Sequence, residues 1–345
     1  MNILLVSPLP PPSGGMATWT EQYLKNSDNI NNIYTVNTAF IGKRALHRGN
    51  KINILLEFKR LFIILCKYYR ILKHNKIDII HINSACSKIG IIRDVICVAL
   101  GKKYPIVFHC HCNIQDQLIG KIALKIGNYI FNSVSCVLVL NKKSFNFVQK
   151  QSNVKLALMP NSIDVMSNNN PIKVHDVLKN IIFVGHVKRE KGVYEIIEAA
   201  NQEKDINFHL IGPVSDEVSN LNIPKNVICY GRMERNDVLN KMHDADILLF
   251  PSYTEGFSMV MLEAMAVGLP IIASDVGSNS DMIENEGGLI ISPESTEEIV
   301  HAIELMRNPS IRNKMSKWNL KKVTTNYRSD IIFKALQEVY NEVII

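Results

Sequence analysis

The chain has 345 residues, a length that favours two domains over a single core. Apolar residues make up 47% of it and charged residues 21%, which excludes wholesale disorder and a small disulfide scaffold. Seven cysteines without regular spacing indicate reduced thiols in a cytoplasmic setting. The net charge of +7 divides into +14 for residues 1–165 and −7 for residues 166–345. This asymmetry predicts an anionic partner for the first half, with a solvated lysine-rich coat as the alternative.

Short apolar, β-branched runs alternate with amphipathic stretches along the chain. The runs lack polar/apolar alternation, which is typical of strands buried on both faces of a parallel sheet. Strands are expected at 2–7, 33–38, 78–83, 104–110 and 135–141, and again at 180–185, 207–212, 227–231, 247–251, 269–274 and 288–292. Helices are expected at 17–26, 51–74, 88–101, 117–132, 192–203, 235–244, 257–267, 279–284, 294–307 and 310–323.

This alternation predicts an α/β protein with two open parallel-sheet domains in tandem. We expect the first domain at 1–165 and the second at 166–328, joined through the polar stretch 161–173. A C-terminal helix at about 329–345 is expected to pack back on the first domain. Ligands of open α/β sheets bind beyond the carboxyl ends of strands, so informative residues should follow strands.

Two segments that follow strands are suited to phosphate groups. Gly14 and Gly15 lie between the first strand and a helix, where the backbone can approach a phosphate or a sugar, although a plain tight turn fits equally well. Lys188, Arg189 and Lys191 lie between a strand and a helix in the second half, which suits a diphosphate; a solvated turn is the alternative.

The segment PSYTEGFSMVMLEAMAVGLP (251–270) places two carboxylates eight residues apart. Glu255 lies at the mouth of a helix, and Glu263 lies inside that helix among apolar residues. A partly buried carboxylate needs a polar partner, which a ligand hydroxyl or a structural salt bridge would supply.

The segment EGFSMVMLEAMAVGLP resembles the E-x7-E segment of the retaining glycosyltransferases of family 4. The match extends to the glycine pair, a histidine-bearing strand end, PNSID at 160–164 and the FVG…KG loop. The resemblance implies a GT-B fold, in which two Rossmann-like domains face each other across a cleft. The first domain would bind the acceptor, and the second would bind most of a nucleotide-sugar donor.

The resemblance also implies roles for individual residues. Glu255 would face the transferred sugar, Glu263 would accept hydrogen bonds from the ribose, and Lys191 would bind the diphosphate. The amides of Phe257 and Ser258 would hold the sugar or the phosphates, and Gly14 and Gly15 would approach the donor phosphates. His111 occupies the place of the family's strand-end histidine.

Two positions depart from the family pattern. His186 stands where arginine is common, so it is a weaker, pH-dependent phosphate ligand, or Arg189 or Lys188 substitutes for it. Ser258 stands where glycine is usual, which would narrow the sugar pocket.

No metal and no cofactor are expected. The sequence HCHC (109–112) offers four soft ligands, but neighbours on a strand point to opposite faces and cannot converge on one zinc ion. The pair Asp244 and Asp246 resembles a metal motif of other glycosyltransferases, but here it is interpreted as an exposed helix stop.

The favoured function is a retaining hexosyl- or N-acetylhexosaminyl-type transferase that uses a UDP- or GDP-sugar. Its acceptor would be a lipid-linked glycan of bacterial surface polysaccharide synthesis. The alternatives are a GT-B epimerase or phosphorylase, and a non-catalytic nucleic-acid-binding protein. No nucleic acid is expected as a partner, because basic and aromatic residues are not interleaved as in known RNA modules.

A basic amphipathic helix is expected at 52–74. At 100° per residue its cations fall within a sector of about 140°, and apolar residues such as Leu61 and Phe62 fill the remainder. This pattern predicts peripheral association with the inner face of an anionic membrane, with a core-packed helix as the alternative. The predicted membrane-binding cations are Lys59, Arg60, Lys67, Arg70 and Lys73.

Overall fold

The protein consists of two units, each built around one parallel sheet. The computed structural model describes residues 1–11, 14–27, 30–39, 54–164 and 172–344. One unit comprises Met1–Asn161 together with Ser329–Ile345, and the other comprises Ser162–Arg328. Positions 52–53 of the expected basic helix and 165–171 of the expected linker lie outside the described residues.

The first unit has a six-stranded parallel sheet in the order β2-β1-β3-β4-β5-β6. Its strands are β1 (Asn2–Ser7), β2 (Asn32–Asn37), β3 (Ile79–Ser84), β4 (Ile106–Cys110), β5 (Cys136–Val139) and β6 (Lys155–Leu158). Its helices are α1 (Gly15–Ser27), α3 (Ile54–His74), α4 (Gly90–Leu100), α5 (Ile114–Gln117), α6 (Lys121–Phe131), α7 (Lys142–Gln151) and α15 (Ser329–Ile344).

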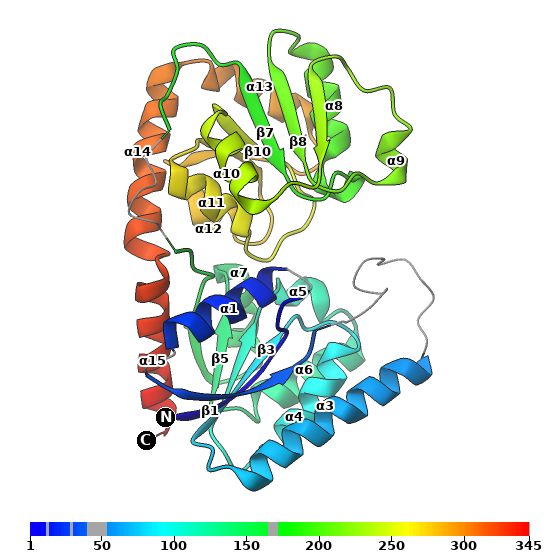
Figure 1. Cartoon of the computed structure of the whole chain (residues 1–345), viewed down its shortest axis with the longest axis vertical. Helices are drawn as coiled ribbons and strands as arrows, with labels where there is room; N and C mark the ends of the chain where they lie inside the picture. The colour runs from blue at the N-terminus through cyan, green and yellow to red at the C-terminus, as the bar shows by residue number, and fades with distance from the viewer. Residues whose placement is uncertain (12–13, 28–29, 40–53, 165–171, 345) are drawn as a thin grey trace. The chain divides into compact units, whose positions relative to one another are not determined.

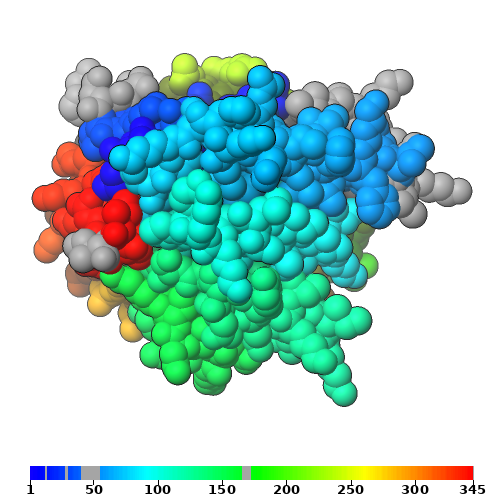
Figure 2. Space-filling model, turned by 90° about the horizontal axis from the view of Figure 1, so that it is seen from below, coloured from blue at the N-terminus to red at the C-terminus, as the bar shows by residue number. Residues whose placement is uncertain are grey.

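Helices cover both faces of this sheet (Figure 1). On one face α1 and the C-terminal α15 pack together, and Trp19, Tyr23 and Tyr340 are buried there. On the other face α3, α4 and α6 bury residues such as Tyr68 and Phe131. Figure 2 shows α3 on the outside of the unit, running across the face that is seen from below.

The second unit repeats the plan with the order β12-β11-β10-β7-β8-β9, again all parallel. Its strands are β7 (Asn180–Val184), β8 (Asn207–Ile211), β9 (Val227–Gly231), β10 (Ile247–Phe250), β11 (Ile271–Ser274) and β12 (Gly288–Ile291). Its helices are η1 (Arg189–Lys191), α8 (Val193–Gln202), α9 (Asp216–Ser219), α10 (Arg235–His243), α11 (Met259–Val267), α12 (Asn279–Ile283), α13 (Thr296–Met306) and α14 (Pro309–Asn326).

The two parallel sheets confirm the predicted α/β architecture. Each of the eleven expected strands is present, with ends shifted by at most about two residues. The sequence interpretation missed β6, α5, α7 and α9. Among the described residues, no helix combines the length and apolar character needed to cross a bilayer.

One interpretation near β10 is wrong in part. Asp244 caps the end of α10 and is exposed, as expected for a helix stop. Asp246, however, is buried and accepts hydrogen bonds from the amides of Lys179 and Asn180, each at 2.9 Å. The buried guanidinium of Arg312 lies 3.8 Å away, so this carboxylate ties α14 to the sheet. Its structural partners explain why an aspartate stands here.

Candidate active site

The strand order of the second unit reverses between β7 and β10. Chain segments that leave these two neighbouring strands diverge, and the space between them is where open α/β sheets bind ligands. The segment after β7 leads into η1, and the segment after β10 leads to Glu255. The residues singled out from both motifs therefore lie beside each other at one edge of the sheet.

Lys191 and Glu255 form an ion pair across this point. The Lys191 Nζ atom donates a hydrogen bond to Glu255 Oε1. Only 25% of the lysine side chain and 14% of the glutamate side chain are exposed, so the pair is largely screened from water. The same ammonium lies 6.0 Å from the centroid of the Phe250 ring. A cation and an anion, each partly accessible, are thus fixed at the carboxyl edge of the sheet.

Glycine is required where the two segments touch. Gly192 has φ +74°, and a Cβ atom there would overlap the carbonyl oxygen of Pro251. Gly277 has φ +57°, and a Cβ atom there would overlap the carbonyl oxygen of Glu255. A larger residue at either position would push apart the segments that carry Lys191 and Glu255.

The turn after Glu255 prepares the start of α11. Ser258 is buried, and its Oγ accepts a hydrogen bond of 3.2 Å from the Met261 amide, which caps the helix. Phe257 is also buried and packs edge-on against Tyr327, with ring centroids 5.7 Å apart. The Ser258 hydroxyl is therefore engaged in capping, which gives a local reason for serine at this position.

Glu263 lies on α11 with 15% of its side chain exposed, which confirms the expected partial burial. Its Oε1 accepts a hydrogen bond of 3.1 Å from Arg235 Nε at the start of α10. Burial raises the pKa of the Glu263 carboxyl, and the Arg235 guanidinium opposes that shift. The salt-bridge alternative for Glu263 is therefore present, and Arg235 was not identified from the sequence.

The other basic residues of the loop after β7 are more exposed than Lys191. His186 and Arg189 are exposed. The guanidinium of Arg189 lies over the Tyr194 ring at 5.3 Å, and Lys188 pairs with Glu190 at 3.4 Å. Of the predicted phosphate ligands in this loop, Lys191 contacts Glu255.

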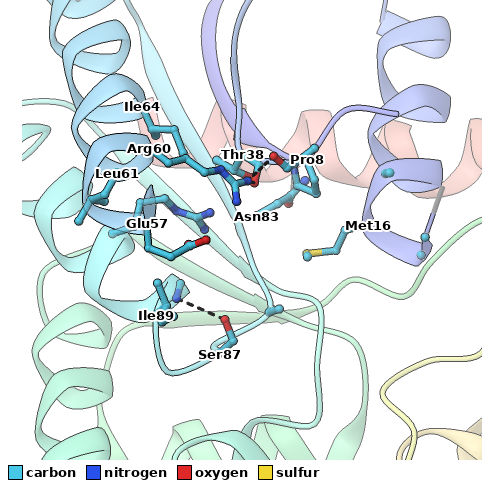
Figure 3. A pocket seen from close by; sticks show the side chains of 17 residues that line it. Pro8, Met16, Thr38, Glu57, Arg60, Leu61, Ile64, Asn83, Ser87 and Ile89 are labelled. Atoms are coloured by element: carbon cyan, nitrogen blue, oxygen red, sulfur yellow. Dashed lines mark hydrogen bonds between the residues drawn. The ribbon is translucent and has the colours of Figure 1, made fainter. Parts of the chain in front are cut away.

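In the first unit, Gly14 and Gly15 line a cavity (Figure 3). A Cβ atom at either position would meet no other atom within 4 Å, so the backbone there borders open space. The cavity lies at the carboxyl ends of β1, β2 and β3, where the strand order of this unit reverses.

His111 directly follows β4 and belongs to a buried cluster of imidazoles. Its ring centroid lies 4.0 Å from that of His109 and 5.2 Å from that of Trp19. Both His111 Nε2 and His81 Nε2 donate to Asn83 Oδ1, at 3.0 and 2.9 Å. Burial lowers the pKa of His81 and of His111 to about 3, so both rings are neutral. Strand alternation correctly predicted that His111 and His109 share one face, but it did not reveal their partners.

The opposite face of the same strand carries thiols. Cys110 and Cys112 are buried and hydrogen-bonded to Cys86, and these hydrogen bonds lower the pKa of the Cys86 thiol. The HCHC residues therefore separate into an imidazole side and a thiol side. Within the described ranges, no group of three histidine, cysteine or acidic side chains is arranged to hold a metal ion.

Comparisons with known proteins agree with this architecture. Residues 168–322 match the family model of "Glycosyl transferases group 1". An uncharacterized 41.2 kDa protein in the cps region of Klebsiella pneumoniae is 25% identical over 333 residues, 90% of this chain and 89% of that protein. The UDP-Gal:alpha-D-GlcNAc-diphosphoundecaprenol alpha-1,3-galactosyltransferase of Escherichia coli is 23% identical over 85% of this chain and 82% of that enzyme.

Solved structures show the same fold. Anabaena Alr3699/HepE in complex with UDP superposes with a TM-score of 0.78 and 15% identity, covering 99% of this chain and 100% of that one. The family match lies within the second unit, whereas the agreement in fold extends over the whole chain. The chain has the GT-B fold, its second unit matches the group 1 glycosyltransferases, and it is similar to enzymes of capsule and lipopolysaccharide synthesis.

The contact at Gly192 can be tested against a matched glycine. Gly231 also has a positive φ, +70°, but a Cβ atom there would meet nothing within 4 Å. Both Gly192→Ala and Gly231→Ala incur the left-handed backbone cost of about 1–2 kcal/mol. Gly192→Ala should lower the free energy of unfolding by a further ~1–3 kcal/mol because of overpacking against Pro251. Urea denaturation measures both values, and equal losses would contradict the proposed close approach.

The buried imidazoles predict an acid-labile fold. An unfolded histidine binds its proton near pH 6.5, whereas His81 and His111 resist protonation until about pH 3 in the folded chain. The unfolded state therefore binds more protons between these values, and stability falls as pH decreases below 6.5. Each of the two rings should contribute about 1.4 kcal/mol per pH unit. Denaturation at pH 7.5, 6.0 and 5.0 measures the slope, and the exposed His301→Gln variant should leave it unchanged.

Proposed function

We propose that this protein is a retaining glycosyltransferase that moves a sugar from a UDP- or GDP-sugar to a hydroxyl of a lipid-linked glycan. The product would enter a bacterial surface polysaccharide. The observation that carries the proposal is the Lys191–Glu255 pair at the point where β7 and β10 diverge. It joins a cation suited to a diphosphate with a carboxylate suited to the reacting sugar.

The leaving group of such a reaction is a nucleoside diphosphate, whose negative charge grows as the glycosidic bond breaks. A positioned ammonium stabilises that charge more strongly in a partly desolvated site than in water. Lys191 is in such a position, and it is shared between Glu255 and the donor diphosphate. Glu263 and Arg235 lie on neighbouring helices of the same unit, where they would contact the nucleoside. The leaving phosphate would accept the proton of the acceptor hydroxyl on the same face, which preserves the anomeric configuration.

His111 is proposed to hydrogen-bond the transferred sugar. Its neutral ring is oriented by Asn83, which accepts from Nε2 and thereby fixes the tautomer. Because Nε2 donates to Asn83, the neutral imidazole would accept a hydrogen bond from a sugar hydroxyl through Nδ1.

The acceptor class is supported by the activities for which two relatives are named. The Escherichia coli relative acts on a diphosphoundecaprenol-linked sugar, and an Acholeplasma laidlawii relative is a processive diacylglycerol alpha-glucosyltransferase. Both acceptors are lipids. A lipid-linked acceptor requires that the enzyme work at a membrane surface, and the first unit offers a surface for this.

The outer face of α3 combines cations with exposed apolar side chains. Four of the five predicted cations are exposed, namely Lys59, Lys67, Arg70 and Lys73. Arg60 is not among them, because its Nη2 donates to the carbonyl oxygen of Thr38 at 2.8 Å and to that of Ala39. Phe58 and Phe62 are 65% and 68% exposed, so apolar side chains of this helix also lie on its outer surface.

Transfer and donor binding should depend on different residues. Glu255→Ala should lower turnover by ~10²–10⁴, the range for a positioned catalytic group. Lys191→Ala should weaken binding of the matching nucleoside diphosphate by roughly 10–150-fold, because a charged hydrogen bond is lost. Donor screening by nucleoside diphosphate release, with short-chain polyprenyl-diphosphate sugars as acceptors, measures the first effect, and calorimetry measures the second.

The exposed Glu286→Ala and Lys204→Ala variants serve as charge-matched controls and should behave like the unaltered protein. NMR of the product distinguishes retention from inversion. Nucleotide-sugar conversion without an acceptor would indicate an epimerase, and turnover of Glu255→Ala within a few-fold of the unaltered enzyme would remove this residue from the mechanism.

The surface of α3 should bind anionic membranes. Each cation near such a surface contributes about 1 kcal/mol, so replacing Lys59, Lys67, Arg70 and Lys73 with Gln should weaken binding to phosphatidylglycerol vesicles by at least tenfold. A control with the same charge change replaces Lys102, Lys103, Lys142 and Lys150, which are exposed elsewhere on the unit. Vesicle sedimentation at low and high salt measures both, and equal losses would show that net charge, not this helix, determines binding.

A further inference from the structure

The first unit has a cavity of about 280 Å³ at the carboxyl ends of β1, β2 and β3 (Figure 3). Its walls come from the start of α1, the inner side of α3 and the start of α4. The strand order reverses between β1 and β3, so this is the position where an open α/β sheet binds a ligand. Sites for whole drug-sized ligands measure about 300–1,000 Å³, so this volume suits one group of a larger molecule.

Two guanidinium groups and one carboxylate line the cavity, which favours an anionic group. Arg93 forms an ion pair with Asp94, which is fully buried. Arg93 Nε donates to Asp94 Oδ1 at 2.8 Å, and Nη2 lies 2.6 Å from the same oxygen. Ser84 Oγ donates to Asp94 Oδ2 at 2.5 Å, which fixes the carboxylate in turn.

This arrangement leaves some N–H donors of the Arg93 guanidinium available for a ligand. Its side chain is 14% exposed, and within the described chain no hydrogen bond is made by its Nη1 group. An arginine that is oriented by a buried carboxylate and still has unused N–H groups is well prepared to bind a phosphate. Across the cavity, Figure 3 shows Arg60 turned toward Thr38, and Glu57 projects from the same helix.

The cavity shares one lining residue with an apolar groove on the outer side of α3. Leu61 lines both spaces, and the groove is otherwise formed by Leu55, Phe58, Lys59, Phe62 and Leu65. Ile64 and Ile89 add apolar surface inside the cavity. Leu61 therefore lies between the charged cavity and the exposed apolar side chains of the surface that we propose to bind membranes.

We infer that this cavity binds the diphosphate of a polyprenyl-diphosphate-type acceptor, with Arg93 as its ligand and with the lipid chain leaving over Leu61 along α3. The inference rests on the proposed function and names the part of the acceptor that the first unit recognises. A nucleotide donor shares the diphosphate but has no apolar chain, so the groove favours the lipid.

Binding of farnesyl diphosphate tests the inference without requiring transfer. Removing Arg93 alone would leave Asp94 as an unpaired buried carboxylate, so the test variant is the double substitution Arg93→Gln with Asp94→Asn. It should weaken farnesyl diphosphate binding by about 10–150-fold and leave UDP and GDP binding within twofold. Lys88→Gln, which removes an exposed cation just before α4 that does not line the cavity, should change neither.

A second variant tests the path of the chain and does not alter the buried pair. Phe58→Ser with Phe62→Ser should weaken binding of farnesyl diphosphate but not of inorganic pyrophosphate. Unchanged farnesyl diphosphate affinity in a folded Arg93→Gln, Asp94→Asn variant would overturn the inference, as would an equal loss of UDP or GDP affinity. A protein that binds farnesyl diphosphate through Arg93 but transfers no sugar would instead overturn the proposed function and leave the inference standing.

Discussion

A parallel sheet that grows in both directions from an inner strand leaves a gap at its carboxyl edge, because the connections on either side of that strand diverge. Both units of this protein are built in this way. In the first unit the reversal lies between β1 and β3, and in the second it lies between β7 and β10. The cavity beside Arg93 and the Lys191–Glu255 pair are located at these two gaps. The topology of each sheet therefore fixes where chemistry can occur before any side chain is considered.

Close backbone contacts convert these gaps into defined sites. In the second unit, Gly192 lets the loop after β7 touch Pro251, and Gly277 lets a third loop approach the carbonyl of Glu255. The ion pair needs this proximity, because a lysine and a glutamate on separate flexible loops would lose side-chain entropy on pairing and gain little in water. Partial burial of both side chains makes the pair stronger than an ordinary surface salt bridge.

The sequence predicted the sheets well and the partners of charged residues poorly. Eleven strands could be located because buried β-branched runs are a local signal, whereas the short β6, with partly exposed residues, gives a weaker one. Glu255 and Lys191 were recognisable from their motifs, and the helix around Glu263 predicted its burial. Arg235 was missed because its pairing joins residues 28 positions apart, which no periodicity records.

The same limit explains the error at α3. Angles along a helix give the relative directions of side chains, so Arg60 fell within the same sector as the other cations. They do not show which way the sector faces or how far a long side chain reaches. Arg60 extends inward to the carbonyl oxygens of Thr38 and Ala39, which lie beyond the end of β2. The cations of the first half therefore lie on two distinct surfaces. Lys59, Lys67, Arg70 and Lys73 face outward, whereas Arg60 and Arg93 line the cavity. Leu61, which borders both the cavity and the outer groove, joins the two surfaces, and a molecule with an anionic head and an apolar chain is the chemistry that matches both.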